Sequence, residues 1–349
     1  MATGYLLDRI LLQFTKSPPP APILHQDLSA VCWVGEQLWL ASDETTSLEC
    51  LTGLEHHRFN HHQSYSLGDF LEGFNSEAGE VDIEGLDFDG QYLWLTGSHS
   101  LKRKKPKGDN GDRLKKVELE INRFLLARIP LVDGQLHRTC KRLTAAYLQR
   151  NDTGNLLTEA LRNDQWLAPF LNGGIPGKDN GFDIEGLAVY QEKTLIGLRG
   201  PVLRGMAVVL EVEVEPIEAP YLGLKSLGKS GDRYKKHFFD LDGLGIRELC
   251  RCGQDLLILA GPTMDLDGVL RVFRLFKAFD LPDNSLTQQE PGKLEWLFDI
   301  AYGKGTDRAE GMTLFSEFNQ IPSVLVVYDT PDSARELLPN GVFADVFQV

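Results

Sequence analysis

Cysteine is scarce in this sequence, and its spacing does not suit a metal site. The 349 residues include 5 Cys, an odd number that cannot pair completely into disulfides. The two closest, Cys250 and Cys252, are one residue apart, whereas zinc clips usually have about two to four residues between their thiols. These features favour free, buried or half-buried thiols in a reducing compartment.

Long apolar runs and an excess of basic residues are absent as well. No stretch approaches the roughly 20 apolar residues of a membrane helix, and residues 1–16 lack the apolar core and cleavage site of a secretory signal. Lys and Arg number 36 against 50 Asp and Glu, which gives a net charge of −14. Because binding to DNA requires a basic face, no DNA partner is expected. The lack of a membrane run and of a secretory signal leads us to expect a soluble, cytoplasmic protein with no membrane partner.

The signatures of common hydrolases are also missing. Neither the G-x-S-x-G motif of serine hydrolases nor the H-E-x-x-H motif of zinc proteases occurs. Residues 223–230 match the phosphate-binding loop by letters, but Gly231 and Asp232 follow where that loop requires a helix. The standard active sites of these classes are therefore not expected.

The most informative feature that is present is a repeated phrase: an acidic residue, a glycine, and a leucine or methionine at the start of an apolar run. A turn and a second apolar run follow each copy. Such a unit cannot bury its apolar faces alone, so the copies should pack around one axis. They are Asp82-Ile83-Glu84-Gly85-Leu86, Asp183-Ile184-Glu185-Gly186-Leu187, Asp240-Leu241-Asp242-Gly243-Leu244 and Arg308-Ala309-Glu310-Gly311-Met312, with a weaker copy at 27–31.

The spacing of the copies predicts an all-β fold, a single β-propeller domain over residues 1–349. Three of the four intervals fit one four-stranded blade with its loops. The long second interval, between the copies that begin at residues 82 and 183, could hide a blade, but we prefer insertions: a basic loop at about 101–118 and a helical segment at about 151–181. The helical segment should contain one amphipathic helix over residues 155–171. Residues 6–14 would complete the last blade and close the ring. Five blades are expected, with six as the alternative.

The repeat should also build a site. Its acidic residues, Glu84, Glu185, Asp242 and Glu310, come at the start of the innermost strands and should ring one mouth of the channel. Crowded carboxylates repel each other unless a proton, a hydrogen bond or a cation intervenes. A divalent cation is one solution, Ca²⁺ before Mg²⁺. The alternative is that these carboxylates are structural and hold backbone amides of the next blade.

Cationic residues are expected near the same mouth, at the ends of the second strands and in the basic loop. His99 and Arg199 close two second strands, Lys102 and Arg103 begin the basic loop, and Arg204 follows shortly after Arg199. Such cations suit a small anionic ligand, for example a phosphate ester or a carboxylate. The basic loop could instead be solvated, or contact an acidic protein partner or RNA.

Several of these motifs resemble a known family. Asp-Ile-Glu-Gly-Leu at 82–86 and 183–187, Thr-Gly-Ser-His-Ser at 96–100, Gly-Leu-Arg-Gly-Pro at 197–201 and Ala-Glu-Gly-Met at 309–312 resemble the bacterial DUF3616 family, whose function is unknown, over nearly the whole chain. More distantly, the strand-initial Glu-Gly resembles calcium-dependent propeller lactonases and phytase-like esterase propellers. That resemblance implies Glu84, Glu185 or Glu310 as a metal ligand, although the Asn ligands of those enzymes have no clear counterpart here.

Two functions remain open at this point. The first is a metal-dependent hydrolase of an anionic ester, a phosphoester or a lactone, in which the cation polarises the ester and lowers the pKa of a bound water. His99 would be the general base, and Arg199 and Lys102 would hold the anion. The second is a non-catalytic propeller that binds a ligand or a protein on the same face.

Overall fold

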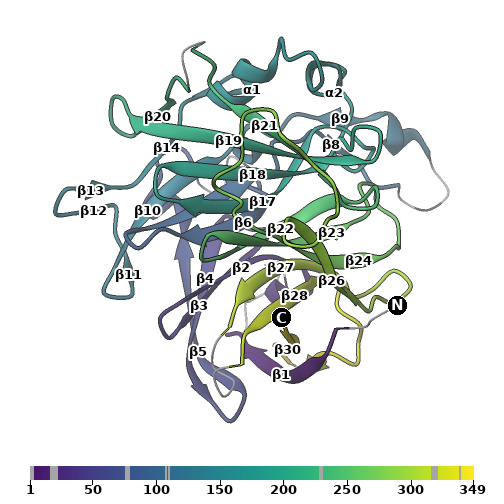
Figure 1. The fold of residues 1–349 in the computed structure, drawn as a ribbon. Helices are drawn as coiled ribbons and strands as arrows, with labels where there is room; N and C mark the ends of the chain where they lie inside the picture. Colours follow the sequence, from purple (N-terminus) through teal and green to yellow (C-terminus); the bar gives the residue numbers. More distant parts are fainter. Residues whose placement is uncertain are drawn as a thin grey trace.

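The computed structural model describes residues 4–15, 23–74, 79–106, 108, 111–227, 231–315, 321–337 and 339–349. In these residues the protein is almost entirely β-structure with two short α-helices (Figure 1). None of the described helices is long and apolar enough to cross a membrane. The predicted all-β propeller fold is confirmed.

The main described strands follow one another in five antiparallel units of four, and the first strand named in each unit is the innermost. The first unit comprises β2 (Leu28–Val34), β3 (Gln37–Ser42), β4 (Ser47–Glu55) and β5 (Arg58–Ser66). The second comprises β6 (Ile83–Phe88), β7 (Tyr92–Gly97), β10 (Leu126–Val132) and β14 (Ala146–Leu148). The third comprises β17 (Asp183–Tyr190), β18 (Lys193–Gly200), β19 (Met206–Pro216) and β21 (Lys235–Asp240).

The fourth unit comprises β22 (Gly245–Cys252), β23 (Asp255–Gly261), β24 (Leu270–Leu275) and β26 (Leu294–Ile300). The fifth comprises β27 (Arg308–Leu314), β28 (Ser323–Asp329), β30 (Gly341–Gln348) and β1 (Leu6–Gln13). The shorter strands at the periphery are β8 (Lys102–Arg103), β9 (Val117–Glu118), β11 (Gln135–Leu136), β12 (Thr139–Cys140), β13 (Leu143–Thr144), β15 (Arg150–Asn151), β16 (Gly154–Asn155), β20 (Tyr221–Leu224), β25 (Leu286–Thr287) and β29 (Glu336–Leu337). Parallel edge pairings of β1 with β5 and of β14 with β20 join four of these units into a nine-stranded and an eleven-stranded sheet.

The two ends of the chain meet in the fifth unit, as the sequence predicted. β1 pairs with β30 in antiparallel register, with Ile10 opposite Ala344, and Figure 1 shows the purple first strand beside the yellow last one. β1 also forms a short parallel pairing with β5 of the first unit. The seam is therefore hydrogen-bonded on both sides, which removes an exposed strand edge.

The innermost strands contact one another in a ring: β2 with β6, β6 with β17, β17 with β22, β22 with β27, and β27 with β2. The buried apolar side chains lie between neighbouring sheets. Trp39 of β3, for example, shares a cluster with Leu93 of β7, and Leu195 of β18 shares one with Ile258 of β23. The core is thus a set of layers around a central axis, as in propellers.

The glycine of the repeat is explained by the crowding at this axis. A Cβ on Gly85 would lie 2.8 Å from Leu187 Cβ and 3.1 Å from the Leu187 backbone nitrogen. A Cβ on Gly186 would lie 2.8 Å from Leu249 Cγ. Adjacent innermost strands therefore approach each other too closely for a side chain at this position.

The two predicted insertions differ in detail from expectation. The basic loop contains the β8–β9 pair and a 3-10 helix (Gly111–Lys115); residues 107, 109 and 110 lie outside the described part. The single helix expected over 155–171 is wrong, because two short helices, α1 (Leu156–Leu161) and α2 (Ala168–Asn172), occupy that segment. Asp164 separates them by accepting hydrogen bonds from the backbone N–H groups of Trp166 and Leu167.

Candidate functional site

One residue of each innermost strand lies in a β-bulge near the start of the strand. In all five strands the pairing with the second strand skips this residue. A bulge re-aims the extra side chain, and all five side chains are buried. Because the five strands surround the axis, the bulges place one side chain per unit around one end of the channel. We call this set the bulge ring: Ser29, Glu84, Glu185, Arg247 and Glu310.

The bulge ring corrects the predicted position of the fourth repeat. Asp242 precedes β22, is exposed, and accepts hydrogen bonds from Arg271 and from Gln289 (2.9 Å). Its positive φ of 58° places it in a turn rather than a strand. The residue equivalent to Glu84 and Glu185 is Arg247. The spacing of Ile246 and Leu249, which matches that of Ile83 and Leu86, is the sequence signal for the correct register.

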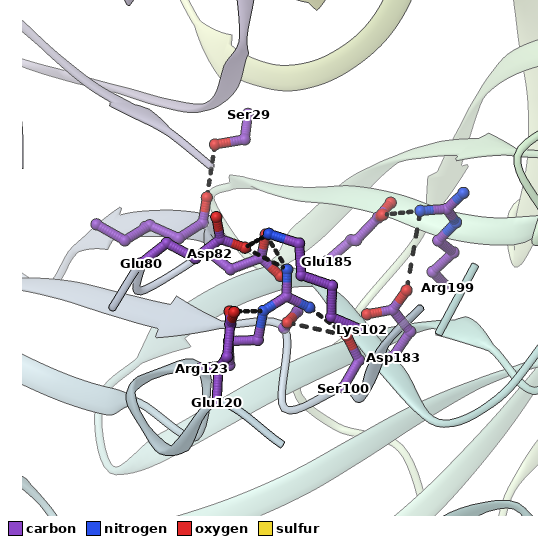
Figure 2. Close-up of polar contacts among 12 residues, drawn as sticks. Ser29, Glu80, Asp82, Ser100, Lys102, Glu120, Arg123, Asp183, Glu185 and Arg199 are labelled. Carbon is purple, nitrogen blue, oxygen red and sulfur yellow. Dashed lines mark hydrogen bonds and ion pairs between the residues drawn. The ribbon is translucent and has the colours of Figure 1, made fainter. Parts of the chain in front are cut away.

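Two buried arginines hold the carboxylate of Glu185. Arg199, at the end of β18, donates from Nη1 to Glu185 Oε1 at 2.7 Å and lies 3.8 Å from Asp183 (Figure 2). Arg247 Nε lies 3.1 Å from Glu185 Oε2, and the same guanidinium contacts Glu310. The two guanidinium groups therefore supply the countercharge for carboxylates of the third and fifth units.

A third arginine organises the acidic residues of the second unit. Arg123, which ends a 3-10 helix (Ile121–Arg123), lies 2.9 Å from Glu80, 3.0 Å from Asp82 and 3.3 Å from Glu120. Figure 2 shows the Arg123 guanidinium among these carboxylates, with Lys102 reaching Glu80 from the basic loop. Arg123 was not singled out from the sequence, because nothing in its local pattern marks it.

Three of the predicted metal ligands have ion-pair partners in the structure. Glu185 and Glu310 are paired with arginines, and Asp242 lies outside the ring. In the described ranges, no group of three or more His, Cys, Asp or Glu side chains could hold a metal ion. Guanidinium groups therefore lie beside carboxylates that the sequence suggested as Ca²⁺ ligands. Ca²⁺ binding stays an untested prediction.

His99 was predicted to lie at the mouth, but it does not. Ser98 is the residue equivalent to Arg199, and His99 follows it with a positive φ of 54°. Its Nδ1 donates to the Gly97 carbonyl at 2.8 Å, and its Nε2 accepts from Asn155 Nδ2 at 2.7 Å. Burial lowers the pKa of His99 to about 4. With both nitrogens engaged, His99 anchors the N-terminus of α1 and is not available as a general base.

The remaining predicted anion-binding residues also have structural partners or lie elsewhere. Lys102 pairs with Glu80, and Arg103 Nε lies 2.5 Å from Asp179 Oδ2, which joins the basic loop to the helical insertion. Arg204 is exposed in a tight turn after β18. None of the three is among the described residues that line the pocket at the mouth.

That pocket, which we call the mouth pocket, opens over the bulge ring and has a volume of about 430 Å³, including space open to solvent. Its walls come from the ring, from the helical insertion, from the β23–β24 loop and from the segment before β27. Four of its side chains are cationic: Lys178, Arg199, Arg247 and Arg308. Lys178 belongs to the predicted helical insertion, but its place at the mouth could be seen only in the fold.

Carboxyl groups deeper in the mouth favour their protonated forms. Burial and the nearby charge of Asp82 raise the pKa of Glu84 well above its usual value. Burial and the charge of Glu310 do the same for the pKa of Asp43. Burial therefore shifts both groups toward their neutral, protonated forms.

Two further carboxyl groups have pKa values close to neutrality. Burial raises the pKa of Asp183 to about 7, although Arg199 opposes the shift. Burial also raises the pKa of Glu310 to about 8, against the opposing effect of Arg247. Such values are typical of functional sites, although structural ion-pair networks produce them too.

Comparison with solved structures gives similarities at low sequence identity. The glutaminyl cyclase of Myxococcus xanthus is 10% identical with a TM-score of 0.44, over 100% of this chain and 98% of that one. A streptogramin B lyase is 7% identical with a TM-score of 0.39, over 99% and 100%. No activity is transferred from either, and no curated protein matches the chain by sequence.

A match to one family covers most of the chain and agrees with the motifs described above. The model of the family described as "Protein of unknown function (DUF3616)" matches residues 27–345. This span includes all five innermost strands, the bulge ring and the mouth pocket. The chain therefore belongs to the DUF3616 family.

Proposed function

We propose that this protein binds a small anionic ligand in the mouth pocket. The observation that supports the proposal is the convergence of Lys178, Arg199, Arg247 and Arg308 on one cavity in a protein of net charge −14. The same cavity is also lined by Asp265, Asp267 and Glu310, so its four cationic residues outnumber its three acidic residues by one. Ligand pockets commonly hold a few fixed polar groups of this kind.

The two central arginines are well suited to fix an anion. Arg199 is 4% exposed and Arg247 is 5% exposed, and Glu185 orients both guanidinium groups. A guanidinium has five N–H donors in a planar fork, so each keeps donors beyond those that face Glu185. Preoriented arginines lose little side-chain entropy when a carboxylate or phosphate binds.

Lys178 is the cation best placed to contact the ligand directly. It is exposed, and no hydrogen-bond or ion-pair partner of its ammonium is found among the described residues. The closely packed surroundings of this exposed side chain would lower the pKa of Lys178 by removing water, but Glu310 and Asp43 raise it above its usual value. Lys178 therefore stays charged, and an anion would neutralise it.

A titration of the full-length protein with inorganic phosphate and with acetate tests the proposal. We expect saturable binding by calorimetry and a rise in the melting temperature, since a ligand stabilises the native state by mass action. Lys178→Ala should weaken binding roughly tenfold, because a hydrogen bond to a charged group is lost. Lys293→Ala, which removes an exposed lysine paired with Glu290, should leave binding unchanged. If neither anion binds, or if both variants behave alike, the proposal is wrong.

A hydrolase of anionic esters, such as phosphoesters or lactones, is the second candidate. Glu310 favours it, because this residue lines the mouth pocket and has a pKa of about 8. General acid–base catalysis works best near such values. Glu310 would take the proton of a water that attacks the ester and return a proton to the leaving oxygen, while the arginines hold the anionic group.

Turnover of a panel of phosphomonoesters and lactones separates the two candidates. If the protein is a hydrolase, Glu310→Gln should lower kcat by about 100-fold or more and change KM little. If no member of the panel that binds is turned over, the mouth pocket is a binding site without hydrolytic activity.

A further inference from the structure

Three exposed apolar side chains lie on the rim of the mouth pocket, next to the exposed carboxylates of Asp265 and Asp267. Met264 is 42% exposed, Leu266 58% and Tyr302 45%, and all three line the same cavity as the buried Arg199 and Arg247. Single exposed apolar side chains are common, but a group of them at one cavity indicates a contact surface.

We infer that the ligand is an amphiphilic acid, whose anionic group lies on the floor of Arg199, Arg247 and Lys178 and whose apolar chain or ring lies on the rim. This inference rests on the proposed function and specifies its ligand class. Arg199 and Arg247 are buried in the cavity, whereas Lys178 and the three apolar side chains are exposed, so the head of the ligand would point inward to the two arginines.

The rim is held in place by three polar contacts, so its apolar side chains are not those of a loose loop. Both carboxylate oxygens of Asp267 accept a hydrogen bond from the Gly305 backbone nitrogen, at 2.9 and 3.0 Å. Asp265 pairs with Arg308 at 2.7 Å. The backbone of Met264 bridges to Asp179 of the helical insertion.

The third contact, between the backbones of Met264 and Asp179, also links the rim to Lys178. Asp179 follows Lys178 directly, and Arg103 of the basic loop fixes the Asp179 side chain. The backbone nitrogen of Gly177 also donates to the Leu101 carbonyl at 3.2 Å. Apolar rim and cationic floor are therefore built as one rigid surface, which lowers the entropy cost of binding a ligand across both.

Binding of a series of straight-chain carboxylates tests the inference. Acetate, butyrate, hexanoate and octanoate would be titrated into the full-length protein by calorimetry, below the concentration at which octanoate forms micelles. We expect the affinity to rise about two- to fourfold for each methylene group that reaches the rim.

Two variants assign the effect to the rim and to the floor. Leu266→Ser should remove most of the dependence on chain length and leave the affinity for acetate unchanged. Lys178→Ala should weaken all four acids by the same factor. Leu286→Ser is the matched control, because Leu286 is 59% exposed on β25 and does not line the mouth pocket.

The outcomes distinguish this inference from the proposed function. If acetate and octanoate bind equally well, or if Leu266→Ser and Leu286→Ser have the same effect, the amphiphilic ligand is excluded while anion binding stands. If none of the four acids binds but phosphate does, the same conclusion holds. If neither the acids nor phosphate bind, both the inference and the proposed function are wrong.

Discussion

The charged residues of the mouth form a compensated network that the chain supplies by itself. Carboxylates on neighbouring innermost strands would repel each other, and the sequence left a bound cation and a structural role for these carboxylates as alternatives. Arg247 carries out much of the neutralisation, because its guanidinium contacts both Glu185 and Glu310. Removing one partner from a buried ion pair destabilises the folded protein, because the remaining charge is left buried with neither a counterion nor water around it.

Replacing Arg247 by Met should therefore destabilise the protein by about 3–5 kcal/mol, measured by urea denaturation. Arg138→Met is the control, because Arg138 and Glu72 form an exposed pair at 3.6 Å, and such pairs contribute about 0–1 kcal/mol. Equal losses for the two variants would show that the Arg247 network does not stabilise the fold.

Asp183 should make stability depend on pH. Its pKa is raised to about 7 in the folded state, so the folded protein binds this proton more tightly than the unfolded chain does. The resulting stabilisation is complete below a pH of about 4 and is lost as the pH rises through about 7.

Asp183→Asn lacks this titration. The stability of the wild type relative to this variant should fall with rising pH, by of the order of 4 kcal/mol between pH 4 and 8. Urea denaturation of both proteins at several pH values measures the difference. Parallel curves over this range would contradict the raised pKa.

At the scale of the element, the innermost strand with its bulge is the unit that builds the site. The bulge turns one extra side chain toward the channel, and the following glycine lets the next strand approach. In the fourth strand Glu248 takes the place of that glycine, and its carboxylate accepts hydrogen bonds from the Leu187 and Leu249 backbone nitrogens. The same strand geometry thus carries a carboxylate, a guanidinium or a hydroxyl at the ring.

Gly85→Ala tests the close approach of the innermost strands. The added Cβ would lie 3.1 Å from the Leu187 backbone nitrogen, which cannot move without shifting β17. We expect a loss of about 1–3 kcal/mol, the usual cost of overpacking, in urea denaturation. Gly111→Ala, where the new Cβ meets no atom within 4 Å, should be near neutral. A neutral Gly85→Ala would mean that β6 and β17 can separate freely.

The elements that could be predicted from the sequence are those with short, continuous apolar runs. Strand pairs such as residues 92–96 after 82–86 were recognised, because strands buried on both faces leave such runs, and every residue of β7 is buried. The fourth innermost strand was placed too early, because an acidic residue followed by Gly and Leu occurs both at a bulge and in the turn at Asp242. The predicted helix failed because Asp164 caps a new turn within it, a local hydrogen bond that apolar spacing does not reveal.

For the whole molecule, closure of the ring determines which residues meet. Lys178, Arg247 and Arg308 are far apart in sequence and come from different segments, so no motif connects them before the chain folds. The sequence located the mouth through its repeated Glu-Gly, and this part was correct for Glu84, Glu185 and Glu310. It predicted Arg199 near the mouth but could not identify Lys178, Arg247 or Arg308 there, because their positions depend on register and on the path of the helical insertion.

The response of the whole molecule to calcium follows from this network. Because guanidinium groups already pair with Glu185 and Glu310, binding of Ca²⁺ would have to displace them. We therefore expect that neither millimolar Ca²⁺ nor EDTA changes the melting temperature of the full-length protein. A bound ion that prefers the native state would raise it by mass action.

If Ca²⁺ raises the melting temperature and Glu185→Gln abolishes the rise, the carboxylates bind a metal after all, and the arginines are displaced in the occupied state. If phosphate or octanoate raises it while Ca²⁺ does not, the mouth is selective for anions.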